Sequence, residues 1–338
     1  MRCGMRFPES MYIFLLAAVV SFGHAAAADG PRFSFPAVCQ LGVSCWAVNY
    51  FDTDRTPAAA DFRCGAQTYD GHYGTDFAVR DAKAIEQGVN VVAAASGTVL
   101  RVRDGVMDHE PTKEDLAKVL ADNKGCGNGV LIDHGDKWQS MYCHMKRGSI
   151  AVKPGQKVLS GDVIGQIGQS GAAEFPHLHF GVTYAGKDID PFTGLEAGTG
   201  CGAQNITPRW QLSIAYSPFA LYAAGFAPGA AEYGQIQKDA GTPATMRRAD
   251  LKALSFWMAY FGPARGDRIH MEVTAPDGSV FAKQDIVQDK TRARQFYFVG
   301  KKVDGKQMLP GLYTGKATLV REGSEVLTGE IAKTVTLE

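Results

Sequence analysis

Glycines divide the central part of this chain, residues 69–191, into many short apolar runs, and this spacing restricts the folds that are open to it. Examples of such runs are 75–79 (TDFAV), 97–102 (GTVLRV), 130–133 (VLID) and 177–182 (HLHFGV). Short runs at close spacing are typical of strands, so the pattern predicts an antiparallel β domain. One segment differs. Residues 112–123 (TKEDLAKVLADN) begin with a capping threonine and acidic residues, which predicts a short helix inserted between two strands.

A second β pattern follows a glycine-rich connector at 194–208. Its apolar and aromatic runs are 254–261, 269–273, 295–299 and 313–320. The sequence Ala-Pro-Asp-Gly at 275–278 is a turn signal between two of these runs. We therefore predict a mainly β protein. An antiparallel β domain spans 69–200, and a small accessory β-sandwich, immunoglobulin-like in type, spans 207–338.

Residues 1–28 have the layout of a secretory signal peptide. Arg2 and Arg6 precede a compact apolar run at 11–22, and small residues at 24–28 offer cleavage sites. The apolar run is short for a membrane span, and an uncleaved N-terminal anchor is the alternative. We expect cleavage after export, which gives a periplasmic or secreted protein.

Cysteine usage agrees with export. Beyond Cys3, which lies in the signal segment, the cysteines are Cys39, Cys45, Cys64, Cys126, Cys143 and Cys201. An even number in an exported chain indicates disulfides, and the chain contains no C-x-x-C pair that would favour a cysteine-rich metal site. The first three lie in a lead-in, residues 29–68, with little periodicity. We predict a Cys126–Cys143 disulfide, because Cys126 directly precedes one expected strand and Cys143 lies on another that can pair with it.

The charge balance bears on the kind of partner. Lys and Arg total 35, and Asp and Glu also total 35. A neutral chain gives no electrostatic reason to expect nucleic acid as a partner.

Histidines and one aspartate recur on local patterns in the first β domain. His72 lies in a glycine-flanked turn and Asp76 follows it in a strand, so a turn can bring both side chains to one ion. His177 and His179 alternate along a strand and therefore project from the same face. His144 lies between these two segments in the sequence. The other histidines of the mature chain, for which we expect surface, packing or backbone hydrogen-bonding roles, are His109, His134 and His270.

Two imidazoles and one carboxylate form the ligand set of a catalytic zinc, because a tetrahedral ion then keeps one open position for water. A hard, all-oxygen site for Mg²⁺ or Ca²⁺ is not offered. Non-haem iron uses the same ligands and is the chemical alternative. We predict Zn²⁺. Of the neighbouring His177 and His179, one can bind the metal while the other handles protons.

The same residues resemble the lysostaphin-type, or LytM-type, zinc endopeptidases of peptidoglycan. The family pattern begins with H-x-G-x-D, matched at 72–76, and ends with P-H-L-H-F, matched at 176–180. The intervening family motifs are matched in order at 88–99, 127–134, 142–144 and 152–165. The resemblance covers roughly residues 69–191, and order and spacing agree throughout.

The resemblance implies a role for each of these residues. It makes His72, Asp76 and His179 the zinc ligands, with His144 and His177 as the catalytic pair beside the bound water. In such a site the metal polarises the scissile carbonyl, one histidine takes the proton, and the other stabilises the oxyanion. The sequence departs from the family at the helical insertion and at 172–175 (AAEF), which replaces small hydroxyl-rich residues. Contacts with substrate are expected to differ there.

Together these expectations describe an exported zinc metalloendopeptidase that hydrolyses peptide bonds in peptidoglycan bridges or stem peptides. The alternative is a non-enzymatic, wall-binding regulator that activates another wall hydrolase. Regulators of this family have typically lost metal ligands, and this chain keeps all of them. We expect peptidoglycan as the partner of the first domain and an envelope protein as a partner of the C-terminal domain. The sequence does not indicate an oligomeric state.

Overall fold

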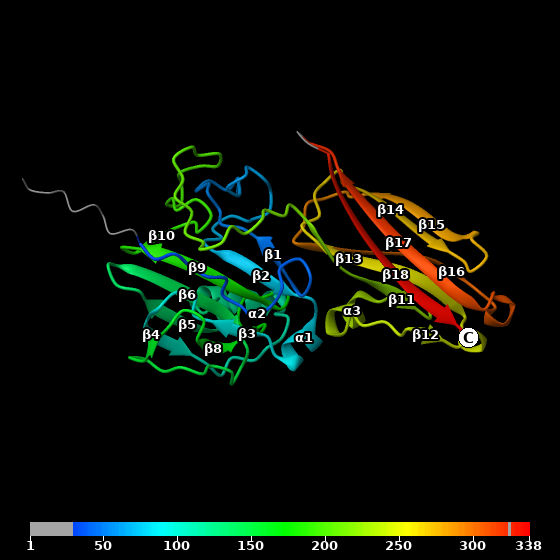
Figure 1. The fold of residues 1–338 in the computed structure, drawn as a ribbon, viewed down its shortest axis with the longest axis horizontal. Coiled ribbons are helices and arrows are strands. Elements are labelled where there is room, and N and C mark those ends of the chain that lie inside the picture. Colours follow the sequence, from blue (N-terminus) through cyan, green and yellow to red (C-terminus); the bar gives the residue numbers. More distant parts are fainter. Residues whose placement is uncertain (1–29, 324–325) are drawn as a thin grey trace, which may run out of the picture. The chain divides into compact units, whose positions relative to one another are not determined.

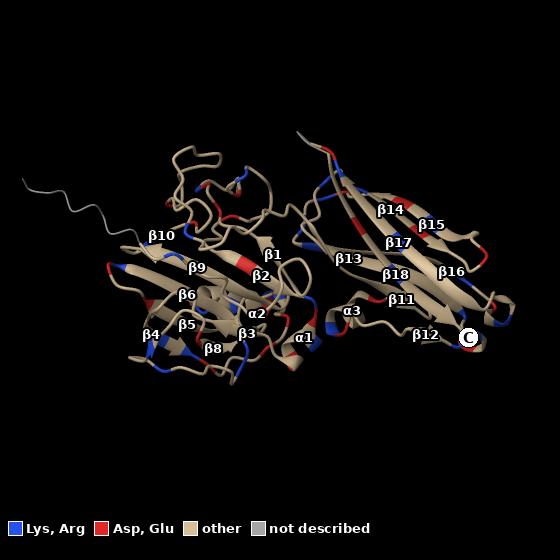
Figure 2. Cartoon of the chain, viewed as in Figure 1, with Lys and Arg blue, Asp and Glu red and all other residues tan. Residues whose placement is uncertain are grey.

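The computed structural model describes residues 30–323 and 326–338 (Figure 1). The predicted signal peptide, residues 1–28, lies outside the described residues. In the part of the chain that is described, no helix is long and apolar enough to cross a membrane. Figure 2 shows that basic and acidic residues are interspersed along the described chain, in keeping with the neutral balance of the sequence.

Strands β1 to β10 form what we call the first β region. Its eight-stranded sheet has the order β1-β2-β9-β6-β5-β4-β7, with β10 paired to β9, and every pairing is antiparallel. The strands are β1 (Cys45–Asn49), β2 (Thr75–Val79), β4 (Gly97–Arg103), β5 (Asn128–Asp133), β6 (Trp138–Met145), β7 (Lys157–Val158), β9 (His177–Tyr184) and β10 (Lys187–Asp188). A smaller sheet pairs β3 (Asn90–Val92) with β8 (Val163–Gln166). The predicted antiparallel β domain is confirmed, and β1 joins it from the lead-in.

Among the described residues, three short α-helices interrupt the strands: α1 (Ala82–Gln87), α2 (Lys113–Ala121) and α3 (Tyr233–Lys238). Two single-turn 3₁₀ helices, η1 (Arg248–Asp250) and η2 (Gly305–Gln307), lie in the C-terminal part. Helix α2 is the predicted insertion, and it lies between β4 and β5. Thr112 and Asp115 form a capping box at its N-terminus, in which each side chain bonds the other's backbone N–H. Helix α2 has no buried residue. Its ends are therefore defined by local capping more than by packing.

The core of the first β region lies on one face of β2 and β9. Phe77, Leu178 and Phe180 are fully buried in it. Since side chains alternate along a strand, the residues on either side of Leu178 project from the opposite face. Burial of Leu178 and Phe180 therefore directs His177 and His179 away from the core, as the sequence pattern predicted.

Strands β11 to β18 form what we call the C-terminal sandwich. One sheet has the order β11-β13-β16 and the other β12-β18-β17-β14-β15. The strands are β11 (Ala220–Ala227), β12 (Thr245–Met246), β13 (Ala253–Phe261), β14 (Arg268–Thr274), β15 (Val280–Val287), β16 (Arg294–Lys302), β17 (Gly311–Arg321) and β18 (Leu327–Leu337). Both sheets bury side chains in one shared core, among them Phe256, Met271 and Leu319. This is the layout of a β-sandwich; the immunoglobulin-like type and the domain boundaries stay predictions.

A separate apolar cluster joins the C-terminal sandwich to the first β region. Phe175, next to β9, packs on Phe261 of β13 with ring centroids 5.2 Å apart. Tyr222 of β11 stacks on Phe261 and also contacts Trp46 of β1. Residues Pro31–Glu338 accordingly form one compact unit. The glycine-rich connector is therefore not the only link between the two sets of sheets.

Three disulfides are present among the described residues. They are Cys39–Cys45, Cys64–Cys201 and Cys126–Cys143. The predicted Cys126–Cys143 bridge is confirmed; it ties the segment after α2 to β6. The Cys64–Cys201 bridge joins the lead-in to the glycine-rich connector.

Candidate metal centre

Three side chains converge on the face of β2 and β9 that is turned away from the core. Asp76 and His179 are directly opposite each other in the pairing of these strands, and His72 reaches them from the turn before β2. Asp76 Oδ1 lies 3.0 Å from His72 Nε2 and 2.9 Å from His179 Nδ1. The two ring nitrogens are 3.1 Å apart. The side chains of His72, Asp76 and His179 are only 1%, 2% and 14% exposed, so the cluster is largely shielded from bulk solvent.

The donor atoms of this cluster fit a metal ion. His72 donates its Nδ1–H to the carbonyl of Tyr50 at 2.7 Å, which leaves a lone pair on Nε2. Asn49 donates to Asp76 Oδ2 at 2.8 Å, so Oδ1 faces the cluster. Two lone-pair atoms 3.0 Å apart in a buried site repel each other unless a proton or a metal cation lies between them. Tetrahedral zinc, with bonds of about 2.0–2.1 Å, sets its ligands roughly 3.3 Å apart.

The pKa shifts of His72 and Asp76 also favour a cation at this cluster. Burial opposes the charged form of His72, yet the Asp76 carboxylate outweighs it and raises the pKa of His72 above its ordinary value. Burial likewise opposes ionisation of Asp76, but the neighbouring His72 and His177 hold the pKa of that carboxyl well below its usual range. The site therefore stabilises positive charge beside an ionised carboxylate.

Two further histidines, His144 on β6 and His177 on β9, lie beside this cluster with ring centroids 4.6 Å apart. Each donates its Nδ1–H to a backbone carbonyl at 2.8 Å, His144 to Ser170 and His177 to Phe175. These bonds fix the tautomer that carries a lone pair on Nε2. Burial lowers the pKa of both rings, and that of His144 falls well below its usual value. Both rings are therefore neutral near pH 7 and able to accept a proton.

The backbone at His144 is unusual. Its φ is +61°, a left-handed conformation that costs a non-glycine residue roughly 1–3 kcal/mol. Its N–H donates to the carbonyl of Cys126 at 2.8 Å, and the next residue back, Cys143, is bonded to Cys126 through sulfur. The disulfide and the hydrogen bond together hold the conformation that aims the His144 ring.

Comparison with known proteins identifies this part of the chain. Residues 70–191 match the sequence profile of Peptidase family M23. They form an M23 peptidase domain. The matched range contains the three residues of the cluster, His72, Asp76 and His179. It also contains the neighbouring histidine pair, His144 and His177.

Three relatives illustrate the range of M23 proteins that this chain is similar to. It is 32% identical over 131 residues to an uncharacterized metalloprotease of Haemophilus influenzae, and 30% identical over 119 residues to the peptidoglycan DD-endopeptidase ShyA of Vibrio cholerae. It is 27% identical over 111 residues to the murein hydrolase activator NlpD of Escherichia coli. These alignments cover 39%, 35% and 32% of this chain, and only 22%, 22% and 26% of the relatives. The chain thus spans about a quarter or less of the length of these relatives.

A glycine of the first M23 motif is required by the packing of the cluster. A Cβ on Gly74 would overlap the His179 ring and would lie 2.9 Å from the carbonyl oxygen of Phe180. The backbone of β9 cannot yield easily, because it is paired on both sides. Only a residue without a side chain lets His179 reach Asp76.

We therefore expect Gly74→Ala to weaken zinc binding. Overpacking of this kind costs about 1–3 kcal/mol, which corresponds to roughly 10–100-fold in affinity if it falls on the bound state. Competition with a zinc-binding dye measures the affinity. Gly234→Ala is the matched control, because a Cβ there meets nothing within 4 Å. Equal zinc affinity in the two variants would show that the Gly74 position is tolerant and that His179 adjusts.

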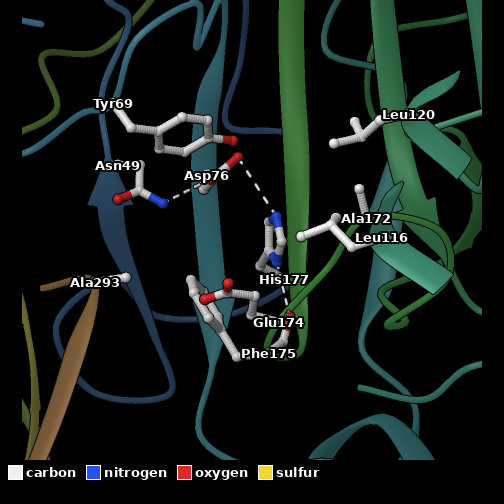
Figure 3. A pocket seen from close by; sticks show the side chains of 10 residues that line it. All are labelled: Asn49, Tyr69, Asp76, Leu116, Leu120, Ala172, Glu174, Phe175, His177 and Ala293. Atoms are coloured by element: carbon white, nitrogen blue, oxygen red, sulfur yellow. Dashed lines mark hydrogen bonds and ion pairs between the residues drawn. The ribbon is translucent and has the colours of Figure 1, made fainter. Parts of the chain in front are cut away.

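A pocket opens beside the cluster, and Figure 3 shows Asp76 and His177 on its wall. Leu116 and Leu120 of α2 line the opposite side, so the helical insertion forms part of the pocket wall. The carboxylate of Glu174, in the segment where the sequence departs from the family, also faces this space. The pocket thus combines apolar walls with acidic groups close to the cluster.

The three histidines that were expected to have no role in the site lie apart from the cluster. His134 bonds the carbonyl of Ser96 and the hydroxyl of Ser140, in the strand-end role that was expected. His109 and His270 are both exposed on the surface.

Several residues that orient the site were missed by reasoning from the sequence. Asn49 and Tyr50 come from the lead-in and hold Asp76 and His72, in the way that outer partners commonly fix metal ligands. Ser170 and Phe175 act through their carbonyls, which every residue possesses, so their identity carries no signal. For Asn49 the one available signal was its place at the end of an apolar run.

Proposed function

We propose that the protein is an exported zinc-dependent endopeptidase that hydrolyses peptide bonds in peptidoglycan bridges or stem peptides. The observation that carries this proposal is the buried cluster of three lone-pair donors with two neutral histidines beside an open pocket. Zinc would be held by His72, Asp76 and His179. A relative named as a peptidoglycan DD-endopeptidase supports the choice of substrate.

Bound zinc would supply a Lewis acid that polarises the scissile carbonyl and acidifies water. The chain's own contribution is proton transfer and charge stabilisation by His144 and His177. Each has its Nδ1–H tied to a carbonyl, so Nε2 can accept the proton of the attacking water and pass it to the leaving amine. The partner histidine, if protonated, can donate a hydrogen bond to the oxyanion. The geometry supports both assignments of these roles.

The second candidate is a non-enzymatic regulator that binds the wall and activates another hydrolase. The similarity to NlpD, a murein hydrolase activator by name, favours it. The presence of all five candidate residues with their orienting hydrogen bonds favours the enzyme, because a regulator has no use for neutral proton acceptors beside a metal cluster.

Digestion of purified sacculi separates the two candidates. An endopeptidase releases fragments with newly exposed amino groups, loses this activity when a chelator removes the metal, and regains it on addition of Zn²⁺. A regulator releases nothing alone but increases the fragments released by an added wall amidase, with or without chelator. Release of fragments that a chelator does not affect would contradict the zinc mechanism.

The location and partners are part of the same proposal. Export rests on the signal-like pattern of residues 1–28, and the likeness to a peptidoglycan DD-endopeptidase supports it. We propose a periplasmic or secreted protein whose partner is peptidoglycan, with an envelope protein as a further partner of the C-terminal sandwich. Mass spectrometry of the exported protein should find an N-terminus within or just after residues 24–28.

A further inference from the structure

One arginine of the C-terminal sandwich reaches the candidate active site. Arg294 is the first residue of β16, and its side chain is 12% exposed. Its Nη2 donates to the backbone carbonyl of Glu174 at 2.8 Å and to the carboxylate of Glu110 at 3.1 Å. These acceptors lie 120 and 184 residues away in the sequence. A single guanidinium thus joins three distant segments of the chain.

Two aromatic rings enclose the same guanidinium. It lies 5.5 Å from the ring centroid of Phe175 and 5.4 Å from that of Tyr233. Arginine suits such a place, because its planar group can stack on rings while its N–H groups point outward to acceptors. An exposed ion pair alone would contribute little. Here the charge is largely buried, and a carbonyl and two rings add to the contact with Glu110.

The contacts on one side of Arg294 lead to His177. The carbonyl of Phe175 accepts the Nδ1–H of His177, and the two rings are 4.9 Å apart. Arg294 therefore holds Phe175 in two ways: its guanidinium contacts the Phe175 ring, and it donates to the carbonyl of the preceding residue, Glu174. Its own carbonyl sets the tautomer and direction of the His177 ring. Displacing residues 174–175 would displace the hydrogen bond that orients His177.

The contacts on the other side lead to the pocket wall. Glu110 lies just before α2, whose Leu116 and Leu120 line the pocket. Gln237 of α3 also donates to Glu110, at 3.1 Å. These bonds add to those of the Asp108 carboxylate, which accepts from the backbone N–H of Arg147 and of Gln169. Together they connect the N-terminal approach of α2, a helix with no buried residue of its own, to the rest of the molecule. Ala293, next to Arg294, lines the same pocket.

We propose that Arg294 is a positioning residue of the peptidase site, and that through it the C-terminal sandwich completes the substrate pocket. It holds residues 174–175, which orient His177, and it holds the approach to the α2 wall. This role deepens the proposed endopeptidase function and rests on it. The sandwich is thus part of the active enzyme, in addition to any tethering on the wall.

The test uses the full mature chain with Arg294→Ala, Arg294→Lys and a control, Arg292→Ala. The control removes an exposed arginine two residues away that makes only a long ion pair with Asp289. Hydrogen exchange of backbone amides, zinc content, and kcat and KM on a soluble cross-linked stem peptide are measured for each. The exchange measurement does not depend on any activity of the protein.

We expect Arg294→Ala to raise exchange at residues 172–177 about tenfold or more, with unchanged zinc content and unchanged exchange in β14 and β17. Its kcat should fall by about 10–100-fold, the scale seen when an outer partner of a catalytic group is lost. Arg294→Lys keeps the positive charge near Glu110 but lacks the planar guanidinium. Its amide exchange at 172–177 and its kcat should therefore lie between those of Arg294→Ala and the wild type. Arg292→Ala should match the wild type in every measurement.

Three results would overturn the proposal. They are unchanged exchange at 172–177, a rise in exchange spread over the whole chain, or a local rise that leaves kcat unaltered. If Arg294→Ala does not fold, the same comparison is decided by Arg294→Lys. If the wild-type protein cleaves nothing, the proposed function fails separately, and the exchange of 172–177 still decides whether Arg294 holds this segment.

Discussion

Replacing His72 or Asp76 with alanine is expected to abolish zinc binding. Each supplies one of three converging donor atoms, and His179 supplies the third. A three-ligand site cannot lose one donor and keep a tightly bound ion, because water must then replace a ligand that the protein holds in place. Metal analysis after dialysis of the purified variants should find about one zinc per chain in the wild type and almost none in either variant.

Two further substitutions make this experiment more specific. His134→Ala removes a histidine that lies outside the cluster and should leave the zinc content unchanged. Asn49→Ala removes the amide that holds Asp76 Oδ2 and should weaken zinc binding by roughly 10–100-fold without abolishing it. Full zinc occupancy in His72→Ala or Asp76→Ala would reject the ligand assignment.

Replacing His144 or His177 with alanine should separate binding from chemistry. Neither ring is needed to hold the ion, so both variants should keep their zinc. Hydrolysis should fall by roughly 10²–10⁴-fold, the usual contribution of a general acid or base. The assay is turnover of a soluble cross-linked peptide at matched zinc content. Turnover at the wild-type rate in both variants would remove these histidines from the mechanism.

The pH dependence follows from the same rings. Burial lowers the pKa of His144 and of His177 below the usual value of about 6.5, and a nearby metal cation would lower it further. A base acts in its neutral form, which persists down to the lowered pKa. The acid limb of kcat/KM should therefore lie below about pH 6.5. An acid limb above that value would indicate that these rings carry charge at neutral pH.

Much of the site could be predicted because its parts are local in the sequence. The spacing of His177 and His179 on one strand, and of His72 and Asp76 across one turn, fixes which side chains can share a face. The capping residues of 112–123 likewise predicted helix α2 from a few neighbouring positions. Such features depend on strand alternation and on capping, which act within a few residues.

The parts that escaped prediction depend on contacts between distant segments. Every residue of β2 is buried, although alternation suggests one exposed face. Ala78 is covered because the cluster that includes Tyr222 of the C-terminal sandwich packs over it. In the sequence, Arg294 cannot be distinguished from other arginines at the end of a strand. Its contacts with Glu110 and Glu174 exist only in the folded chain. No periodicity in one segment contains that information.

The Cys64–Cys201 disulfide closes a covalent ring around the M23 domain, since residues 70–191 lie between its two cysteines. Helix α2, which buries none of its side chains, lies within that ring and is accessible to other proteases. A single cut there would leave both pieces joined through sulfur. In an oxidising compartment the protein could therefore be nicked at the wall of its pocket without separating the segment that carries His72 and Asp76 from the one that carries His179.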